Sequence, residues 1–225
     1  MNIGFFMISV IGMALQAAFI AVEHKEKYLP AVILKGLASL VFVTIGILAA
    51  KTTGNPHYAK LVILGLCFVA LGDILLNLRF LSPQYGQKIF LAGIAVFFAG
   101  HIMYLVALIP LSDHLMISLL IGAALAALLL AYIFHKLTVK LAFRIFGIFY
   151  LGAIVLMTAV AIGNAIVKPD TMRLLFATGA VLFTVSDIVL IFNTFGDKTT
   201  FSRRIVNLSC YYIAQLLIAF TIFFA

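Results

Sequence analysis

Long apolar runs, separated by short polar segments, make up nearly the whole chain. Each run is close to the roughly 20 residues that a helix needs to cross the hydrocarbon layer of a bilayer. A transmembrane β-strand would be about half as long and would alternate polar with apolar residues, so the pattern excludes a β-barrel. The sequence therefore predicts an all-α, polytopic integral membrane bundle of about eight transmembrane helices. Their expected ranges are about 2–22, 29–50, 58–78, 87–109, 114–134, 141–167, 172–193 and 203–224.

The composition agrees with a chain whose solvent is lipid. Of 225 residues, 65% are hydrophobic and 10% charged, whereas soluble domains are nearer half apolar and a quarter charged. The connections between runs are too short to hold a soluble domain, so residues 1–225 are expected to form a single transmembrane domain. The first run lacks a basic leading segment and is too long for the core of a signal peptide, so it is assigned as the first span.

The net charge of +8 changes this picture only by giving an orientation. The cations lie singly or in pairs at the ends of the apolar runs and form no basic face, so no nucleic-acid partner is expected. Ten Lys and Arg residues fall at the odd-numbered connections and four at the even-numbered ones. The positive-inside rule then places the odd connections in the cytoplasm and both termini outside. The short connections favour a bacterial inner (cell) membrane.

Four ionisable side chains lie inside the apolar runs, where each costs about 2.5–3.5 kcal/mol on insertion scales. They are Lys35, Asp73, His101 and Asp187. A single such residue is often a packing contact or a side chain that reaches the interface. The two aspartates, however, sit in similar pentapeptides, 71–75 and 185–189, and at matching depths in two spans that run in the same direction. We therefore expect the four residues to meet in one cavity that opens toward the cytoplasmic leaflet.

Further polar groups share helix faces with these residues. In the fourth span, Phe90, Gly93, Phe97, His101 and Tyr104 recur every three or four positions and form one stripe, which would be plain packing without its histidine and tyrosine. The other candidates are Asn77, one turn beyond Asp73, and Tyr211, Tyr212 and Gln215 in the last span.

Common catalytic and metal-binding motifs are absent from the sequence. Cys67 and Cys210 lie in apolar runs without ligand spacing, so neither a metal site nor a disulfide is expected. Ser186 beside Asp187 leaves nucleophilic serine chemistry open. We expect no metal, no other cofactor and no obligate protein partner.

Together these residues resemble the YhhN-like family of integral membrane proteins, which includes lysoplasmalogenases. The resemblance covers about residues 28 to 220. Lys35 matches a lysine of the family's second span, although Gly36 stands where the family places a proline. The motifs that carry it are Gly72-Asp73, Phe90-x2-Gly93-x3-Phe97-x3-His101-x2-Tyr104, Phe183-x2-Ser186-Asp187 and Tyr211-Tyr212-x-Ala214-Gln215.

The resemblance implies an ether hydrolase acting on a lysophospholipid within the membrane. Lysoplasmalogens carry a vinyl ether at sn-1, and its cleavage releases a fatty aldehyde and glycerophosphoethanolamine or glycerophosphocholine. That reaction needs a protonated carboxylic acid and a second carboxylate, much as glycoside hydrolysis does. Burial and a neighbouring carboxylate both favour the protonated form of a carboxyl group. Asp73 and Asp187 are the expected catalytic pair, with their roles unassigned.

The remaining candidates would bind the substrate. Lys35 would hold the lipid phosphate at the cytoplasmic mouth or interact with a carboxylate. The other expected lining residues are Asn77, Phe97, His101, Tyr104, Ser186, Tyr211, Tyr212 and Gln215.

Two other functions fit the same residues. A lipid or small-molecule transporter could use buried Asp, Lys and His side chains to carry protons or a headgroup. A metal-dependent lipid hydrolase would need several histidines inside the membrane, and this chain has one, so that alternative is disfavoured.

Overall fold

The structure is a computed structural model that describes residues 3–225, and within them the chain forms eight α-helices and no strand. All eight are long and apolar enough to cross a membrane, which confirms the predicted all-α membrane bundle. Short 3₁₀ turns extend α4 to Leu111 and α8 to Phe224. The helices are α1 Ile3–His24, α2 Tyr28–Ala49, α3 Pro56–Leu78, α4 Gly86–Leu108, α5 Leu115–Lys136, α6 Leu141–Val167, α7 Thr171–Phe195 and α8 Phe201–Thr221.

The helix ends follow local signals in the sequence, and no end differs from the predicted range by more than three residues. The side chains of Asn55, Asp170 and Thr200 each accept a hydrogen bond from a backbone N–H in the first turn of the helix that follows. α2 continues through Gly36 without interruption, so a proline is not needed there to shape the helix.

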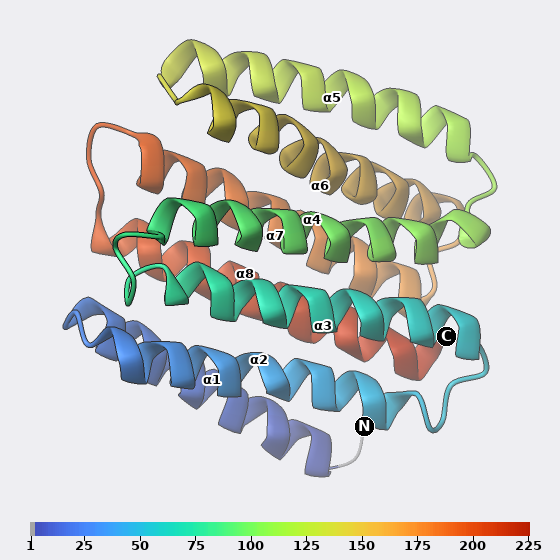
Figure 1. The fold of residues 1–225 in the computed structure, drawn as a ribbon. Helices are drawn as coiled ribbons and strands as arrows, with labels where there is room; N and C mark the ends of the chain where they lie inside the picture. The colour runs from blue at the N-terminus through green and yellow to red at the C-terminus, as the bar shows by residue number, and fades with distance from the viewer. Residues whose placement is uncertain (1–2) are drawn as a thin grey trace.

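Successive helices run in opposite directions and form a broad bundle (Figure 1). α1 and α5 lie at opposite edges of the bundle, and α8 contacts α1, α2, α3 and α7. The odd-numbered connections lie together at one end, whereas the even-numbered connections and the C-terminus lie at the other. The rings of Phe5 and Phe223, 4.6 Å apart, confirm that the chain starts and ends at the same end.

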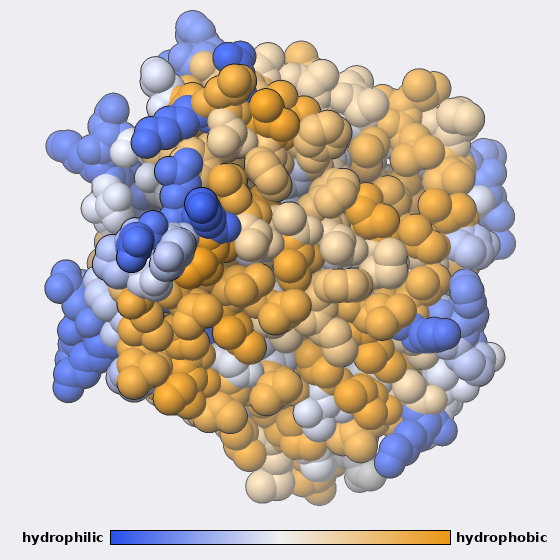
Figure 2. Space-filling model, in the orientation of Figure 1, coloured by the Kyte–Doolittle hydropathy of each residue, from blue (hydrophilic) through white to orange (hydrophobic). Residues whose placement is uncertain are grey.

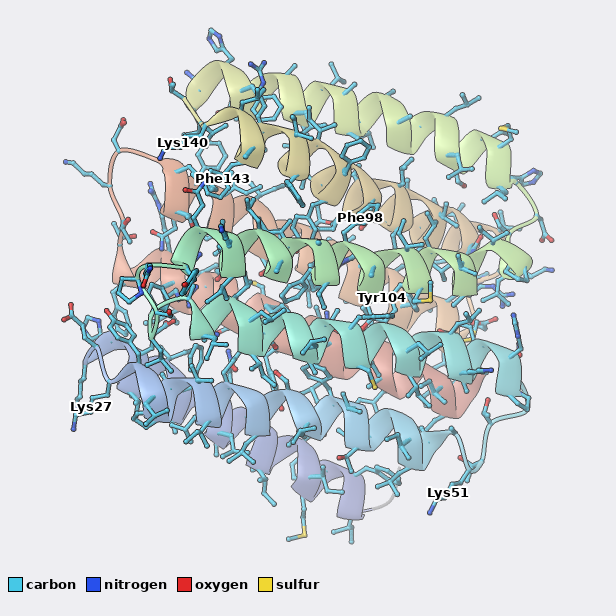
Figure 3. All side chains as sticks on the ribbon, viewed as in Figure 1. Lys27, Lys51, Phe98, Tyr104, Lys140 and Phe143 are labelled. Atoms are coloured by element: carbon cyan, nitrogen blue, oxygen red, sulfur yellow. The ribbon has the colours of Figure 1, made fainter. Side chains whose placement is uncertain are left out.

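The molecular surface has the pattern of a membrane protein. A broad apolar belt separates two hydrophilic ends (Figure 2). Lys27 and Lys140 project from the end with the odd connections, and Lys51 projects from the opposite end (Figure 3). The chain is thus an integral membrane protein, while the cytoplasmic placement of the odd connections stays a prediction.

The pair α3–α4 is held close by small residues, as is common between membrane helices. A Cβ atom at Gly65 would lie 3.1 Å from the carbonyl oxygen of Gly100, and a Cβ at Gly72 would collide with the ring of Phe97. This close approach brings the Phe97 ring against Gly72, the residue before Asp73. Phe97 lines the same cavity as the two aspartates.

The two halves of the chain repeat one another. An offset of 114 residues aligns the sequence of α3 with that of α7 and the sequence of α4 with that of α8. In this alignment Asp73 matches Asp187, and Gly65 matches Gly179. The structural roles match as well, because a Cβ at Gly179 would lie 3.0 Å from the carbonyl oxygen of Ala214, the residue that corresponds to Gly100.

The preceding helices match with an offset of 115. Buried Phe42 and Ile45 of α2 then correspond to buried Met157 and Val160 of α6, and Lys35 corresponds to Tyr150. The contacts between the halves correspond as well. α4 of the first half packs on α6 of the second half, and the equivalent helices α8 and α2 also pack on each other. The five-residue similarity seen in the sequence is therefore part of a parallel repeat of three helices, in which α2, α3 and α4 correspond to α6, α7 and α8.

Candidate active site

Asp73 and Asp187 line the same cavity, although they are far apart in sequence. The cavity measures about 50 Å³ and lies near the end of the bundle that carries the odd connections. Asp73 precedes the end of α3 by five residues and Asp187 precedes the end of α7 by eight, or about 8 and 12 Å along the helices. Its wall consists of Lys35, Asp73, Leu76, Asn77, Arg79, Phe97, Tyr150, Asp187, Leu190, Arg204, Asn207, Leu208 and Tyr211.

Asp73 is surrounded by donors. Its Oδ2 accepts hydrogen bonds from Ser39 Oγ and Tyr211 Oη, both at 2.5 Å. Its Oδ1 lies 3.4 Å from the Lys35 ammonium, and only 4% of the residue is exposed. Three donors, one of them a cation, favour the carboxylate form of Asp73.

Asp187 has a different environment. Its Oδ2 accepts a hydrogen bond from the Tyr150 hydroxyl, and 3% of the residue is exposed. None of the ion pairs found among residues 3–225 includes Asp187. Since both acids are buried, the single neutral donor favours a protonated carboxyl group at Asp187 more than the three donors do at Asp73.

The repeat explains this difference. The positions that correspond to the donors of Asp73 hold Tyr150 for Lys35, Ile154 for Ser39 and Phe97 for Tyr211. The surroundings of Asp187 thus hold one hydroxyl and two apolar side chains where those of Asp73 hold a cation and two hydroxyl groups. Two equivalent positions have become chemically different sites.

Lys35 lines the cavity as expected and lies beside a carboxylate, the second of its two expected positions. The residue is 1% exposed, and its ammonium also donates to Gln16 Oε1 at 3.4 Å and lies 4.2 Å from the centre of the Tyr211 ring. Among residues 3–225, its one ion pair is with Asp73.

His101, Tyr104 and Gln215 do not line the cavity. Tyr104 donates to Gln215 Oε1 at 2.8 Å, deep between α4 and α8. His101 Nδ1 lies 2.7 Å from the carbonyl oxygen of Phe97, and its ring packs at the edges of Phe183 and Tyr150. All three are fully buried, and of them His101 contacts Tyr150 and the backbone of Phe97.

The other expected residues are divided between the wall and its support. Asn77 and Tyr211 line the cavity together with Phe97. Ser186 is not part of the cavity wall; its Oγ donates to the Asn207 carbonyl oxygen at 2.9 Å and accepts from Asn207 Nδ2 at 2.8 Å. Tyr212 donates to the carbonyl oxygen of Ala38 between α8 and α2.

Several wall residues were missed in the sequence. Tyr150 and Asn207 of the wall are neutral, as is Ser39, which bonds Asp73 from outside the wall; such side chains have little cost in a helix bundle and so leave no signal. Arg79 and Arg204 were counted only as cations at the ends of spans.

A second, larger hollow of about 420 Å³ adjoins the cavity, and we call it the vestibule. Arg79 and Arg204 belong to the walls of both hollows, so they lie at their junction. The remaining vestibule residues come from the odd connections and the adjoining helix ends: Glu23, His24, Glu26, Tyr28, Phe80, Asn193, Thr194, Thr199, Thr200 and Phe201.

Comparison with protein-family models matches residues 27–222 to the YhhN family. The chain belongs to the YhhN family. The match confirms the resemblance seen in the motifs and covers both halves of the repeat in this YhhN protein. Searches of curated proteins and of solved structures gave no match. Residues 3–225 contain no group of three or more His, Cys, Asp or Glu side chains placed to hold a metal ion.

Proposed function

We propose that this YhhN protein is a membrane hydrolase that cleaves the vinyl ether of lysoplasmalogens. The observation that carries the proposal is the shared cavity of two buried aspartates in different hydrogen-bonding environments. Membership of a family that includes lysoplasmalogenases is consistent with it. The products are a fatty aldehyde and glycerophosphoethanolamine or glycerophosphocholine.

The environments assign the two acids different roles. Asp187, with one neutral donor, is the general acid, and Asp73, beside Lys35, is the carboxylate that stabilises positive charge and activates water. Tyr150 holds Asp187 by its Oδ2 and so leaves Oδ1 to carry the proton into the cavity.

The reaction begins with proton transfer from Asp187 to the β-carbon of the vinyl ether. The double-bond electron pair forms the new C–H bond, and the ether oxygen stabilises the resulting oxocarbenium ion. Water then adds to the carbon that bears the oxygen, while Asp73 accepts a proton from it.

Collapse of the hemiacetal restores both acids. Asp187 takes the hydroxyl proton back, Asp73 gives its proton to the departing glycerol oxygen, and the C–O bond breaks. One water molecule is consumed, and each carboxyl group returns to its starting form.

The size of the cavity limits what it can hold at rest. A volume of about 50 Å³ accepts a few water molecules but not a lysolipid. Entry of the vinyl ether therefore requires the wall to open, and Arg79 and Arg204 stand at the junction with the larger vestibule.

The proposal is tested by incubating the purified protein in detergent with a lysoplasmalogen and with its saturated alkyl-ether analogue. We expect aldehyde release from the vinyl ether alone, because only the double bond can be protonated to an oxocarbenium ion. Activity that persists in the presence of a chelator would exclude a metal-dependent hydrolase mechanism. Vectorial transport of the lipid in liposomes without turnover would replace the hydrolase by a transporter.

Replacing His101 tests its supporting role. His101→Ala leaves the rings of Phe183 and Tyr150 without their edge contact, and we expect kcat to fall about tenfold to a hundredfold, the usual size of outer-shell effects. His101→Phe keeps a ring in place and should restore most of the rate. If His101→Ala and His101→Phe were both as slow as an aspartate variant, His101 would instead have a part in the chemistry.

A further inference from the structure

The vestibule holds a guanidinium group that lacks a protein anion. Among residues 3–225, none of the ion pairs includes Arg79. Burial and the neighbouring Arg204 lower the pKa of its guanidinium group to about 10, so the group is still charged at neutral pH. Its guanidinium carbon lies 4.6 Å and 4.3 Å from the ring centres of Phe80 and Phe90. These rings fix the plane of the group and leave its N–H donors free for a ligand.

Arg204 is oriented beside it by a carboxylate. Its Nε and Nη2 donate to Glu23 Oε2 and Oε1 at 2.9 and 2.5 Å, a two-point contact that joins α8 to the end of α1. The side chain of Arg204 is 22% exposed, so the pair is only partly screened by solvent. At the junction itself two arginines face one carboxylate, while the second carboxylate of the vestibule, Glu26, belongs to its outer lining and not to the cavity wall.

We propose that Arg79, with Arg204 beside it, binds the phosphate of the lysophospholipid headgroup. Arginine forks match the oxygens of a phosphate group, and the site lies between the larger vestibule and the two aspartates. This subsite rests on the proposed function for its substrate class. It takes the phosphate-binding role that the sequence suggested for Lys35.

The distances along the helix fit such a substrate. Arg79 follows Asp73 by six residues, about 9 Å along the axis of α3, and its long side chain covers part of that separation. In a lysoplasmalogen, about five bonds separate phosphorus from the vinyl-ether oxygen, or roughly 6 Å when extended. A phosphate at the junction would therefore place the vinyl ether between the aspartates, while the headgroup occupies the vestibule.

The test measures binding without turnover. The ligands are a 1-O-alkyl lysophospholipid, which cannot be protonated to an oxocarbenium ion, and a 1-O-alkylglycerol, which lacks the phosphate. For Arg79→Gln we expect a Kd for the lysophospholipid about tenfold to a hundredfold higher, and an unchanged Kd for the alkylglycerol. Arg79→Lys keeps the charge without the fork and should fall between wild type and Arg79→Gln.

The matched control is Arg203→Gln, because Arg203 lies next to Arg204 in sequence but outside both hollows. It should bind both ligands as wild type does. Equal lysophospholipid binding by Arg79→Gln and wild type would overturn the subsite. Displacement by inorganic phosphate as effective as that by glycerophosphoethanolamine would also overturn it, in favour of a free-phosphate site. Because no turnover is measured, the subsite and the hydrolase can fail separately.

Discussion

Asp187→Asn is expected to lower turnover of a lysoplasmalogen by a factor on the order of 10²–10⁴, the usual contribution of a general acid. Asparagine keeps the shape of the side chain and can still accept the hydrogen bond from Tyr150, but it has no acidic proton to give to the β-carbon. Because Asp187 forms no ion pair among residues 3–225, the substitution leaves no charge stranded. The folded protein should therefore melt near the wild-type temperature.

The control for Asp187→Asn is Asp113→Asn, the same exchange at a carboxylate that is 48% exposed and paired with Lys168 at the far end of the bundle. It should leave kcat and KM unchanged. The measurement is aldehyde release per mole of folded protein, with folding checked by thermal melting. A near-wild-type rate for Asp187→Asn would refute the assignment of Asp187 as the acid.

Asp73→Asn is expected to abolish turnover to a similar extent and, unlike Asp187→Asn, to destabilise the fold. The substitution leaves the Lys35 ammonium buried without its carboxylate. Removing one partner of a buried ion pair typically costs about 3–5 kcal/mol. The melting temperature of Asp73→Asn should therefore fall well below that of Asp187→Asn.

The double variant Lys35→Met/Asp73→Asn separates the two effects. Methionine removes the stranded charge, so thermal stability should recover, whereas turnover should not, because the carboxylate that accepts the proton from water is still missing. Recovery of activity in the double variant would show that Asp73 only neutralises Lys35. Equal melting temperatures for the two single variants would contradict the ion-pair asymmetry between the acids.

The sequence predicted the helices well because lipid imposes a simple rule on them. Every backbone group must be bonded within its helix, so apolar runs of the right length define the spans. The ends were also readable, since Asn55, Asp170 and Thr200 are polar caps at the borders of such runs. The convergence of Asp73 and Asp187 on one cavity followed from their cost in lipid and their similar depth.

The wall around the two acids could not be predicted to the same extent. Tyr150 and Ser39 are neutral, and their side chains fit a membrane helix whether or not they bond an acid. His101 is ionisable and was expected in the wall, but it lies one turn beyond Phe97, about 6 Å further along α4, and the cavity ends before that level. The vestibule is built from connections far apart in sequence, so no local pattern predicts it.

The three-helix repeat bears on how an unsymmetrical lipid is oriented. A site made of two like halves offers two like acids, and a vinyl ether could meet either of them with its β-carbon. Lys35, Ser39 and Tyr211 remove this ambiguity by marking one acid as the anion, while Tyr150, Ile154 and Phe97 surround the other. The departure from symmetry at three matched positions thus makes the two sides of the cavity different, and under the proposed hydrolase function it would allow a single productive direction for the substrate.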